Sequence, residues 1–223
     1  MTPIRIGYLV FPKPSASCRI SKTDLTFINY LRQLQGVELE TFVLVAHRRL
    51  RWSHSVFRAL KGHSGWPQNL EQQVEKDLPS ASFVSYAPMP NATFESATTS
   101  LAIELIRRPI HKRPNVLYGS EFDAGGFAAV QVAKTISCAS VAICDLKPAH
   151  AESIEPKSFN RRGRTALHNA DQVVSTSHII SAQLAKGGRT AEVFPPTEND
   201  SNEQKYWLKT QAKLEAIHRN VLS

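Results

Sequence analysis

The sequence predicts an α/β domain built on a doubly wound, mostly parallel sheet of seven strands. Short and almost continuously apolar runs recur along its 223 residues, and segments with helix signals separate them. Strands that are apolar on both faces are typical of a parallel sheet that helices cover on both sides. Hydrophobic residues make up 42% of the chain, which is enough for the core of one ordinary domain.

The strands are expected where β-branched and aliphatic residues run together. The first run, IRIGYLV, ends at Phe11-Pro12 and predicts a strand that enters a loop. Proline-rich pieces after this run and after two later runs also fit loops at strand ends, rather than linkers between domains. The seven expected strands are residues 4–10, 38–46, 81–88, 115–119, 139–144, 172–177 and 191–195.

Helix signals occupy the intervals between these strands. Ser21-Lys22-Thr23-Asp24 has the form of a capping box, and apolar residues follow it at helical spacing. Pro67 and Gly125-Gly126 stand at positions typical of helix starts, and Gly187-Gly188 at a position typical of a helix end. Further helices are expected near residues 67–78, 94–110, 125–136, 158–170 and 178–186.

The last part of the chain differs from the rest. A polar stretch precedes a segment that predicts one amphipathic helix, with Trp207 and Ile217 among the residues of its apolar face. We therefore expect residues 1–200 to form the sheet domain. Residues 201–223 are expected to form a helix that docks on this domain.

Several classes of protein are excluded by what the sequence lacks. No run approaches the ~18 apolar residues of a membrane-spanning helix, and the N-terminal segment has no secretory cleavage site. Three cysteines without CxxC spacing argue against a disulfide framework, so we expect a protein of the reducing cytoplasm. There is no GxGxxG after the first strand, no GxxxxGKS/T, no GxSxG and no HExxH. We therefore expect neither a cofactor nor a metal site.

Ligands of open α/β sheets bind beside the loops that follow the carboxyl ends of the strands. The loop after the first strand carries hydroxyls and cations ahead of a helix start, a combination suited to an anion or a polyol. The alternative is that these residues only keep the loop soluble and cap the helix. The loop after the fifth strand offers an acid, Asp145, and a cation, Lys147, and the alternative there is that the two only pair with each other. The candidate acceptor-binding residues of the two loops are Lys13, Ser15, Ser17, Arg19, Asp145 and Lys147.

The loop after the fourth strand, GSEFDAGG, places two carboxylates against a glycine-rich helix start. A carboxylate in a cleft can act as a general base or accept a hydrogen bond from a sugar hydroxyl. We therefore take Asp123 and Glu121 as candidate catalytic residues. The alternative is that Asp123 only caps the helix that follows, where the helix dipole favours a negative charge.

Positive charge is concentrated in the first third of the chain. Residues 1–65 hold ten Lys and Arg residues against three acids, whereas the remainder is nearly neutral. Residues 47–65 contain no acid and combine basic residues with an apolar stripe, which is typical of a helix in an anionic membrane interface. The alternative is an ordinary helix packed on the core, and nucleic acid is not expected because no recognition motif accompanies the charge. The candidate membrane-surface residues are Arg48, Arg49, Arg51, Trp52, Phe57, Arg58 and Lys61.

Taken together, several segments resemble the N-terminal half of a family-4 glycosyltransferase of the GT-B fold. The opening strand, its Pro/Ser loop and its helix are similar to that family's acceptor-side start. The segment NVLYGSEFDAGGFAAVQVAKTISCASVAICDLK is similar to a family segment in which a strand ends in an acidic loop before a helix and a second strand. The run from Ala170 to Ser177, ADQVVSTS, matches the family's ADxVixxS pattern ahead of a helix.

The resemblance implies a Rossmann-like GT-B half with a C-terminal crossover-like helix. It implies the acceptor-binding half of a sugar transferase, as used in polysaccharide biosynthesis, without the nucleotide-sugar donor domain and its Glu-x7-Glu motif. The implied partners are a sugar or lipid-linked acceptor, a donor-domain subunit and the inner face of an anionic membrane. The alternative is a non-catalytic glycan- or membrane-binding adaptor with a domain of the same origin.

Overall fold

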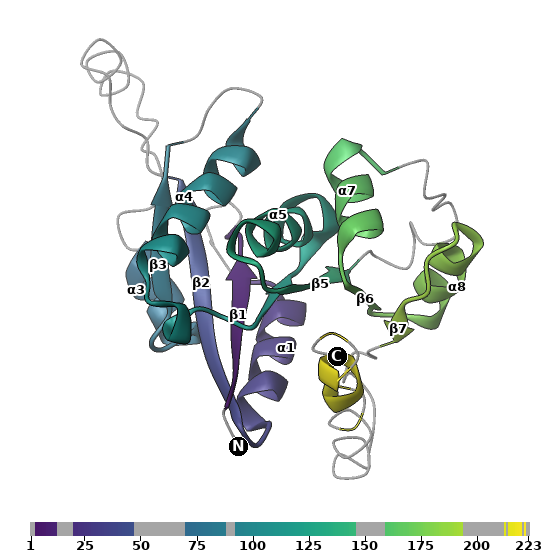
Figure 1. Cartoon of the computed structure of the whole chain (residues 1–223), viewed down its shortest axis with the longest axis horizontal. Coiled ribbons are helices and arrows are strands. Elements are labelled where there is room, and N and C mark those ends of the chain that lie inside the picture. Colours follow the sequence, from purple (N-terminus) through teal and green to yellow (C-terminus); the bar gives the residue numbers. More distant parts are fainter. Residues whose placement is uncertain are drawn as a thin grey trace.

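One parallel sheet organises the chain (Figure 1). The computed structural model describes residues 3–12, 20–46, 70–87, 92–145, 159–193, 212, 214–219 and 221. Within them, parallel strands pair in the order β3-β2-β1-β4-β5-β6-β7. The predicted α/β fold with a seven-stranded doubly wound sheet is thereby confirmed. The strands are β1 (Ile4–Val10), β2 (Val37–Ala46), β3 (Ser82–Tyr86), β4 (Val116–Gly119), β5 (Ala139–Cys144), β6 (Gln172–Ser175) and β7 (Glu192–Val193).

Helices lie in the expected intervals between strands. The two short turns are η1 (Ile110–Lys112) and η2 (Glu121–Gly126), and η2 starts ahead of the helix expected at Gly125. The longer helices are α1 (Lys22–Gln33), α3 (Leu70–Asp77), α4 (Thr93–Arg107), α5 (Phe127–Ile136), α7 (Arg161–Asn169) and α8 (His178–Lys186).

Local chemistry explains where two elements end earlier than expected. The helix expected over residues 94–110 stops at Arg107, because Pro109 pushes the preceding Arg108 into an extended conformation. The strand expected over residues 172–177 stops at Ser175. Its continuation is prevented because the Ser177 side chain accepts a hydrogen bond from the backbone N–H of Ile180 and caps α8.

Helices cover both faces of the sheet. On one face α1 and α3 pack against strand residues such as Tyr8 and Tyr118. On the other face α4 and α5 pack against Leu9 and Leu117, and α7 and α8 extend this layer over β5 and β6. Neighbours such as Tyr8 and Leu9 face opposite layers because side chains alternate along a strand.

The C-terminal helix packs in the same layer as α1. Residues 214–219 are helical, and Leu214 and Ile217 are fully buried in the cluster that contains α1 and the central strands. Since α5 and α7 lie on the opposite face, this helix supplies apolar cover beside β4. The expected domain boundary at residue 200 and Trp207 lie outside the described residues. Within the described segments, no helix is both long and apolar enough to cross a bilayer.

Candidate functional site

The strand order reverses direction between β1 and β4. From β1 the chain winds outward through β2 to β3, and from β4 it winds the other way through β5 to β7. The helix after β1 and the helix after β4 lie on opposite faces of the sheet. Open α/β sheets bind their ligands at the carboxyl ends of strands at such a switch point.

Four polar side chains meet there, and we call them the switch-point cluster: Tyr8 of β1, Ser21 and Asp24 at the start of α1, and Ser120 after β4. The Tyr8 hydroxyl donates to Asp24 Oδ1 at 2.8 Å, and the Ser21 hydroxyl donates to Asp24 Oδ2 at 2.8 Å. The Ser120 side chain lies near enough to Asp24 to lower the pKa of its carboxyl group. Asp24 and Ser120 are each 5% exposed, so hydroxyl groups replace water around this carboxyl group.

Burial raises the pKa of the Asp24 carboxyl, because its charged form loses hydration. The hydroxyls of Ser120, Ser21 and Tyr8 oppose this effect, since they stabilise the charge. The nearby carboxylate of Glu121 raises the pKa of Asp24 further. The pKa of Tyr8 is raised by burial and by the negative charge of Asp24. A buried carboxyl group with a raised pKa, beside the carboxyl ends of strands, makes this cluster a candidate functional site.

Two glycines hold the loop after β4 against the end of that strand. A Cβ atom on Gly119 would overlap the carbonyl group of Gly125, and one on Gly125 would overlap the carbonyl group of Ser120. Only glycine permits this approach of backbone to backbone. Glu121 follows with a φ of 55°, a left-handed conformation that few residues other than glycine adopt. The loop thereby fixes Ser120 and Glu121 close to Asp24.

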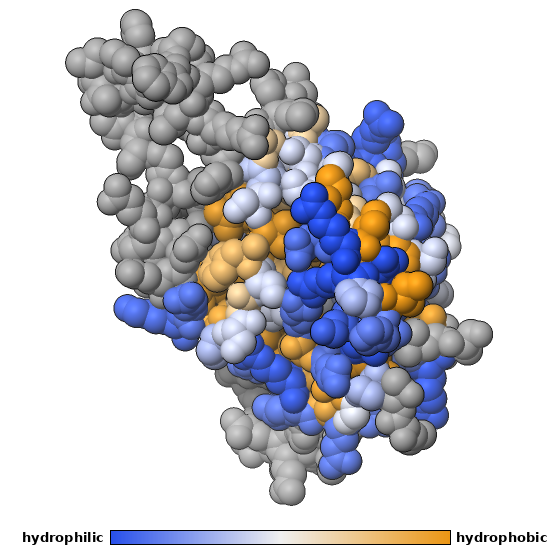
Figure 2. Space-filling view, turned by 60° about the vertical axis from the view of Figure 1, so that its left-hand side comes forward, coloured by the Kyte–Doolittle hydropathy of each residue, from blue (hydrophilic) through white to orange (hydrophobic). Residues whose placement is uncertain are grey.

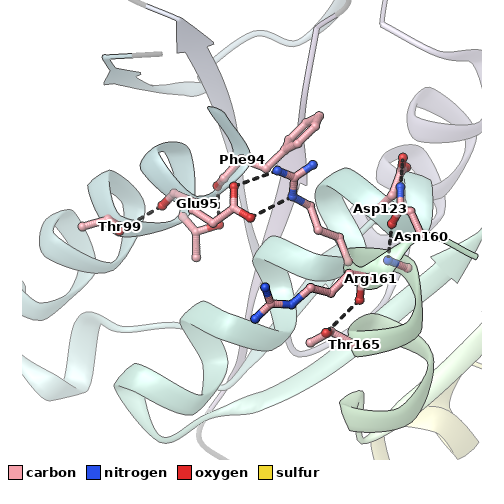
Figure 3. A network of polar contacts seen from close by, with 10 residues as sticks. Phe94, Glu95, Thr99, Asp123, Asn160, Arg161 and Thr165 are labelled. Carbon is pink, nitrogen blue, oxygen red and sulfur yellow. Dashed lines mark hydrogen bonds and ion pairs between the residues drawn. The ribbon is translucent and has the colours of Figure 1, made fainter. Parts of the chain in front are cut away.

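Asp123 connects the same loop to the start of α7 (Figure 3). Asn160 Nδ2 donates to Asp123 Oδ2 at 3.1 Å, and Asn160 Oδ1 accepts from the backbone N–H of Gly163 at 2.9 Å. Asn160 is therefore the N-cap of α7. No side chain caps η2 or α5, so Asp123 does not cap the following helix as the alternative interpretation expected. It is exposed to solvent and braces α7.

An ion pair joins α4 to α7 at the same edge of the sheet (Figure 3). Arg162 Nε and Nη2 donate to Glu95 Oε1 and Oε2 at 2.9 and 3.0 Å, which lowers the pKa of Glu95. The guanidinium carbon of Arg162 lies 5.0 Å from the ring centre of Phe94. Phe94 packs edge-on against Phe11 at the end of β1, with 5.6 Å between ring centres. These contacts tie together three elements around the candidate site.

Two of the candidate residues predicted from the sequence lie near the switch-point cluster. Glu121 acts on Asp24, and the charge of Asp145 contributes to the raised pKa of Tyr8. Asp145 follows β5, is half-buried and lies with its Oδ1 3.5 Å from the hydroxyl of Thr176. The candidates outside the described residues remain predictions: Lys13, Ser15, Ser17, Arg19 and Lys147, and the membrane-surface set Arg48, Arg49, Arg51, Trp52, Phe57, Arg58 and Lys61.

Sequence reasoning misses the residues at the centre of the cluster. It assigns Asp24 only to a capping box, which is also present, since the Ser21 hydroxyl accepts from the Asp24 backbone N–H at 3.0 Å. The available signal is a tyrosine within each of two apolar strands, because a buried phenol needs a hydrogen-bond partner. Tyr8 finds Asp24, and the hydroxyl of Tyr118 lies 2.9 Å from His218 Nε2. Among the described residues, no group of three or more His, Cys, Asp or Glu side chains is arranged to hold a metal ion.

No protein-family model matches the chain, and no curated protein is similar to it in sequence. Solved structures are similar in fold. A UDP-N-acetylglucosamine 2-epimerase superposes with a TM-score of 0.55 at 13% identity, over 86% of this chain and 48% of the epimerase. UDP-GlcNAc 2-epimerase from Neisseria meningitidis bound to UDP-GlcNAc gives 0.54 at 14% identity, over 98% and 52%. UGT89C1 of Arabidopsis thaliana complexed with UDP gives 0.50 at 17% identity, over 92% and 56%.

These neighbours have GT-B-type folds. The chain has the Rossmann-like architecture of one GT-B half, and it spans about half the length of the structures that it matches. At identities this low the likeness is one of fold alone.

Proposed function

We propose that the chain is the acceptor-binding, N-terminal-type half of a GT-B sugar transferase, resembling family 4, and that a separate domain supplies the nucleotide-sugar. The observation that carries the proposal is the switch-point cluster, a buried carboxyl group that accepts hydrogen bonds from two hydroxyls and lies close to Ser120, at the carboxyl ends of β1 and β4. Structures of the same fold that hold UDP or UDP-GlcNAc support it. The proposal assigns the second side of the cleft to the donor domain.

In the proposed reaction, an acceptor hydroxyl attacks the anomeric carbon of a nucleotide-activated sugar. A bond forms between the acceptor oxygen and this carbon, and the bond from the carbon to the diphosphate oxygen breaks. The nucleoside diphosphate leaves, and the acceptor proton passes to a carboxylate. Positioning and electrostatic stabilisation of the leaving diphosphate supply much of such a rate. We therefore expect little turnover by this chain alone.

Glu121 and Asp123 are placed differently for the role of the base. Glu121 is half-buried and interacts electrostatically with Asp24, so it lies beside the cluster that would anchor an acceptor hydroxyl. Asp123 is exposed and accepts a hydrogen bond from Asn160. We therefore assign the base to Glu121, and to Asp123 the bracing of α7 together with a hydrogen bond to the acceptor.

A transfer assay tests this proposal. The purified chain is incubated with UDP- and GDP-sugars and saccharide acceptors, alone and with the product of a neighbouring reading frame that carries a nucleotide-sugar domain. We expect turnover only with the partner, and a loss of about 100-fold or more in Glu121→Gln. Glu75→Gln, an exposed residue of α3, is the matched control. Rapid transfer by the chain alone, or full activity of Glu121→Gln, contradicts the proposal.

A non-catalytic glycan-binding adaptor is the second candidate. The hydrogen bond from Asn160 to Asp123 favours it, because it gives one predicted catalytic residue a structural role. Calorimetric titration with oligosaccharides distinguishes the two candidates. In an adaptor, Asp123→Ala leaves glycan binding intact, whereas in a transferase it lowers the reconstituted activity, because the acceptor loses a hydrogen bond. Asp123→Asn keeps an acceptor for Asn160 and controls for the loss of bracing.

A further inference from the structure

Three of the four exposed large hydrophobic side chains among the described residues lie on one short stretch of the chain. Ile103 and Ile106 on α4 are 45% and 46% exposed, and Ile110 in η1 is 78% exposed. The fourth, Ile179, lies on α8. We call the first three the isoleucine patch. Ile103 and Ile106 are three positions apart on the helix, a spacing that makes them neighbours on its surface.

Hydrogen bonds hold η1 against the end of α4. Arg113 Nη2 donates to the carbonyl oxygen of Ile106 at 2.7 Å, and Arg113 Nε donates to that of Arg108 at 3.0 Å. These carbonyl groups lie at the C-terminal end of the helix, where no further turn supplies donors. Ile110 is therefore presented by a hydrogen-bonded turn.

Basic residues flank the isoleucine patch along the chain. Arg107 and Lys112 are exposed beside it. Arg5 and Arg113 line an adjoining open depression of about 610 Å³, together with Ile110, at the amino edge of the sheet. Figure 2 brings the side of β3 and α4 forward and shows hydrophobic and strongly hydrophilic residues intermixed on that face.

The acid closest in sequence to the patch shares one arginine with a second acid. Glu104 lies 3.5 Å from the Arg108 guanidinium, which also pairs with Glu40 at 2.6 Å. No other acid occurs between residues 103 and 114. The surface thus combines exposed aliphatic side chains with an excess of positive charge.

We propose that the isoleucine patch and its flanking cations dock the protein on an anionic lipid surface. The isoleucines insert at the boundary between headgroups and acyl chains, and the cations attract anionic headgroups. Charge favours this occupant over a second copy of the chain. A symmetric dimer would bring two identical positive surfaces together.

The patch lies far from the switch-point cluster. The 15 residues of α4 span about 22 Å and run from the carboxyl edge of the sheet, at Thr93, to the amino edge, at Arg107. Docking through the patch leaves the cluster about 20 Å from the lipid. The inference is independent of the proposed sugar transfer, because lipid binding needs neither a sugar nor a donor domain.

Vesicle sedimentation of the full chain tests the docking surface. We expect binding to vesicles of phosphatidylcholine and phosphatidylserine, and little binding to phosphatidylcholine alone. Replacing all three isoleucines of the patch by Gln lowers the partition coefficient at least about tenfold, whereas the matched variant Ile179→Gln leaves it unchanged. Arg107→Gln with Lys112→Gln lowers it about 30-fold. All these positions are exposed, so thermal unfolding is expected to stay near that of the parent.

Three outcomes overturn the docking proposal. One is equal binding by the isoleucine variant and by Ile179→Gln. Another is normal binding by the isoleucine variant together with loss of binding when Arg48, Arg49 and Arg51 become Gln. That result assigns the membrane contact to residues 47–65, the segment expected from the sequence. The third is a dimer in light scattering that the isoleucine variant dissociates, without any binding to vesicles, which assigns the patch to a second copy.

Discussion

Two aspartates at opposite edges of the sheet form hydrogen bonds with different kinds of partner. Asp24 lies at the carboxyl edge and Asp171 at the amino edge. Asp24 is 5% exposed and accepts from the hydroxyls of Tyr8 and Ser21. Asp171 is exposed, and its Oδ2 accepts from the backbone N–H and the hydroxyl of Ser140, both at 2.8 Å. Its own N–H donates back to that hydroxyl at 3.2 Å. The bonds of Asp171 thus fix the starts of β5 and β6 against each other.

This difference separates fold from site. Backbone partners specify the path of the chain, whereas a carboxyl group surrounded by hydroxyls can rearrange its protons and accept a ligand hydroxyl. Asp171 belongs to ADQVVSTS, one of the runs in which the sequence most resembles the glycosyltransferase family. In the structure Asp171 organises strands at the edge opposite to the switch-point cluster, so the similarity at this residue supports the fold more than the chemistry.

The largest expected effect breaks the tight loop at the carboxyl edge. Gly125→Ala places a Cβ atom against the carbonyl group of Ser120, and backbone cannot move aside as a flexible side chain can. We expect a loss of more than about 3 kcal/mol in the free energy of unfolding, measured with urea. Gly188→Ala, at a φ of 79° with open space around it, is the control and costs about 1 kcal/mol. Equal losses in the two variants would show that the loop is not tightly packed.

The next largest effect is a pH dependence of stability caused by His218, which lies behind the buried side of the cluster. Tyr8 stacks on Tyr118 with 6.4 Å between ring centres, and Tyr118 contacts His218 of the C-terminal helix. Burial lowers the pKa of His218 from 6.5 to about 4. The unfolded chain therefore binds a proton more readily between these values, and stability falls by about 3 kcal/mol as the pH drops from about 6.5 to about 4.

Denaturant unfolding at several pH values measures this loss. His218→Gln removes the titrating group, so the stability of that variant changes less with pH over the same window. His168→Gln, at an exposed position of α7, is the matched control and keeps the pH dependence of the parent. An unchanged slope in His218→Gln would mean that other groups govern the acid sensitivity.

A smaller effect is expected at the amino edge. Asp171→Ala removes the acceptor for both the N–H and the hydroxyl of Ser140, and we expect a loss of about 2 kcal/mol. Ser140→Ala keeps the bond from the backbone N–H and costs about half as much. Since this edge lies away from the cluster, ligand binding by the folded Asp171→Ala variant is expected to be unchanged, as titration calorimetry can check. A loss of ligand binding in that variant would contradict the assignment of a structural role to the amino edge and a binding role to the carboxyl edge.

The sequence predicts the fold better than the site because the two depend on different ranges of contact. Burial on both faces leaves a continuous apolar run, so residues 4–10 and 139–144 are identified with the bounds that the structure has. The neighbours of Asp24 come from β1, the start of α1 and the loop after β4, and no local pattern reports Tyr8 or Ser120. The bond between Asp123 and Asn160 spans 37 positions and is invisible for the same reason. Tyr8 is the one member whose residue type, in an apolar strand, signals a buried polar partner.

The smallest change in stability is expected when Asp24 is replaced by Asn. Because burial raises its pKa, the folded chain holds this proton more tightly than the unfolded chain, and the ionised carboxylate lowers stability increasingly as the pH rises above about 4. Asp24→Asn removes the charge while keeping an acceptor for Tyr8. We expect it to match or exceed the parent by less than about 1 kcal/mol at pH about 7, with a smaller advantage at pH about 4. Asp24→Ala strands the hydroxyls of Tyr8 and Ser21 and costs about 2 kcal/mol.

Thermal unfolding at the two pH values distinguishes these outcomes. If Asp24→Asn is as damaging as Asp24→Ala, the charge itself stabilises the fold, and Asp24 is a structural residue like Asp171. If Asp24→Asn folds as stably as the parent but loses acceptor binding, the charge serves the ligand. In that case the Asp24 carboxylate lowers stability at neutral pH and the fold does not need it, so ligand binding is the reason for its presence.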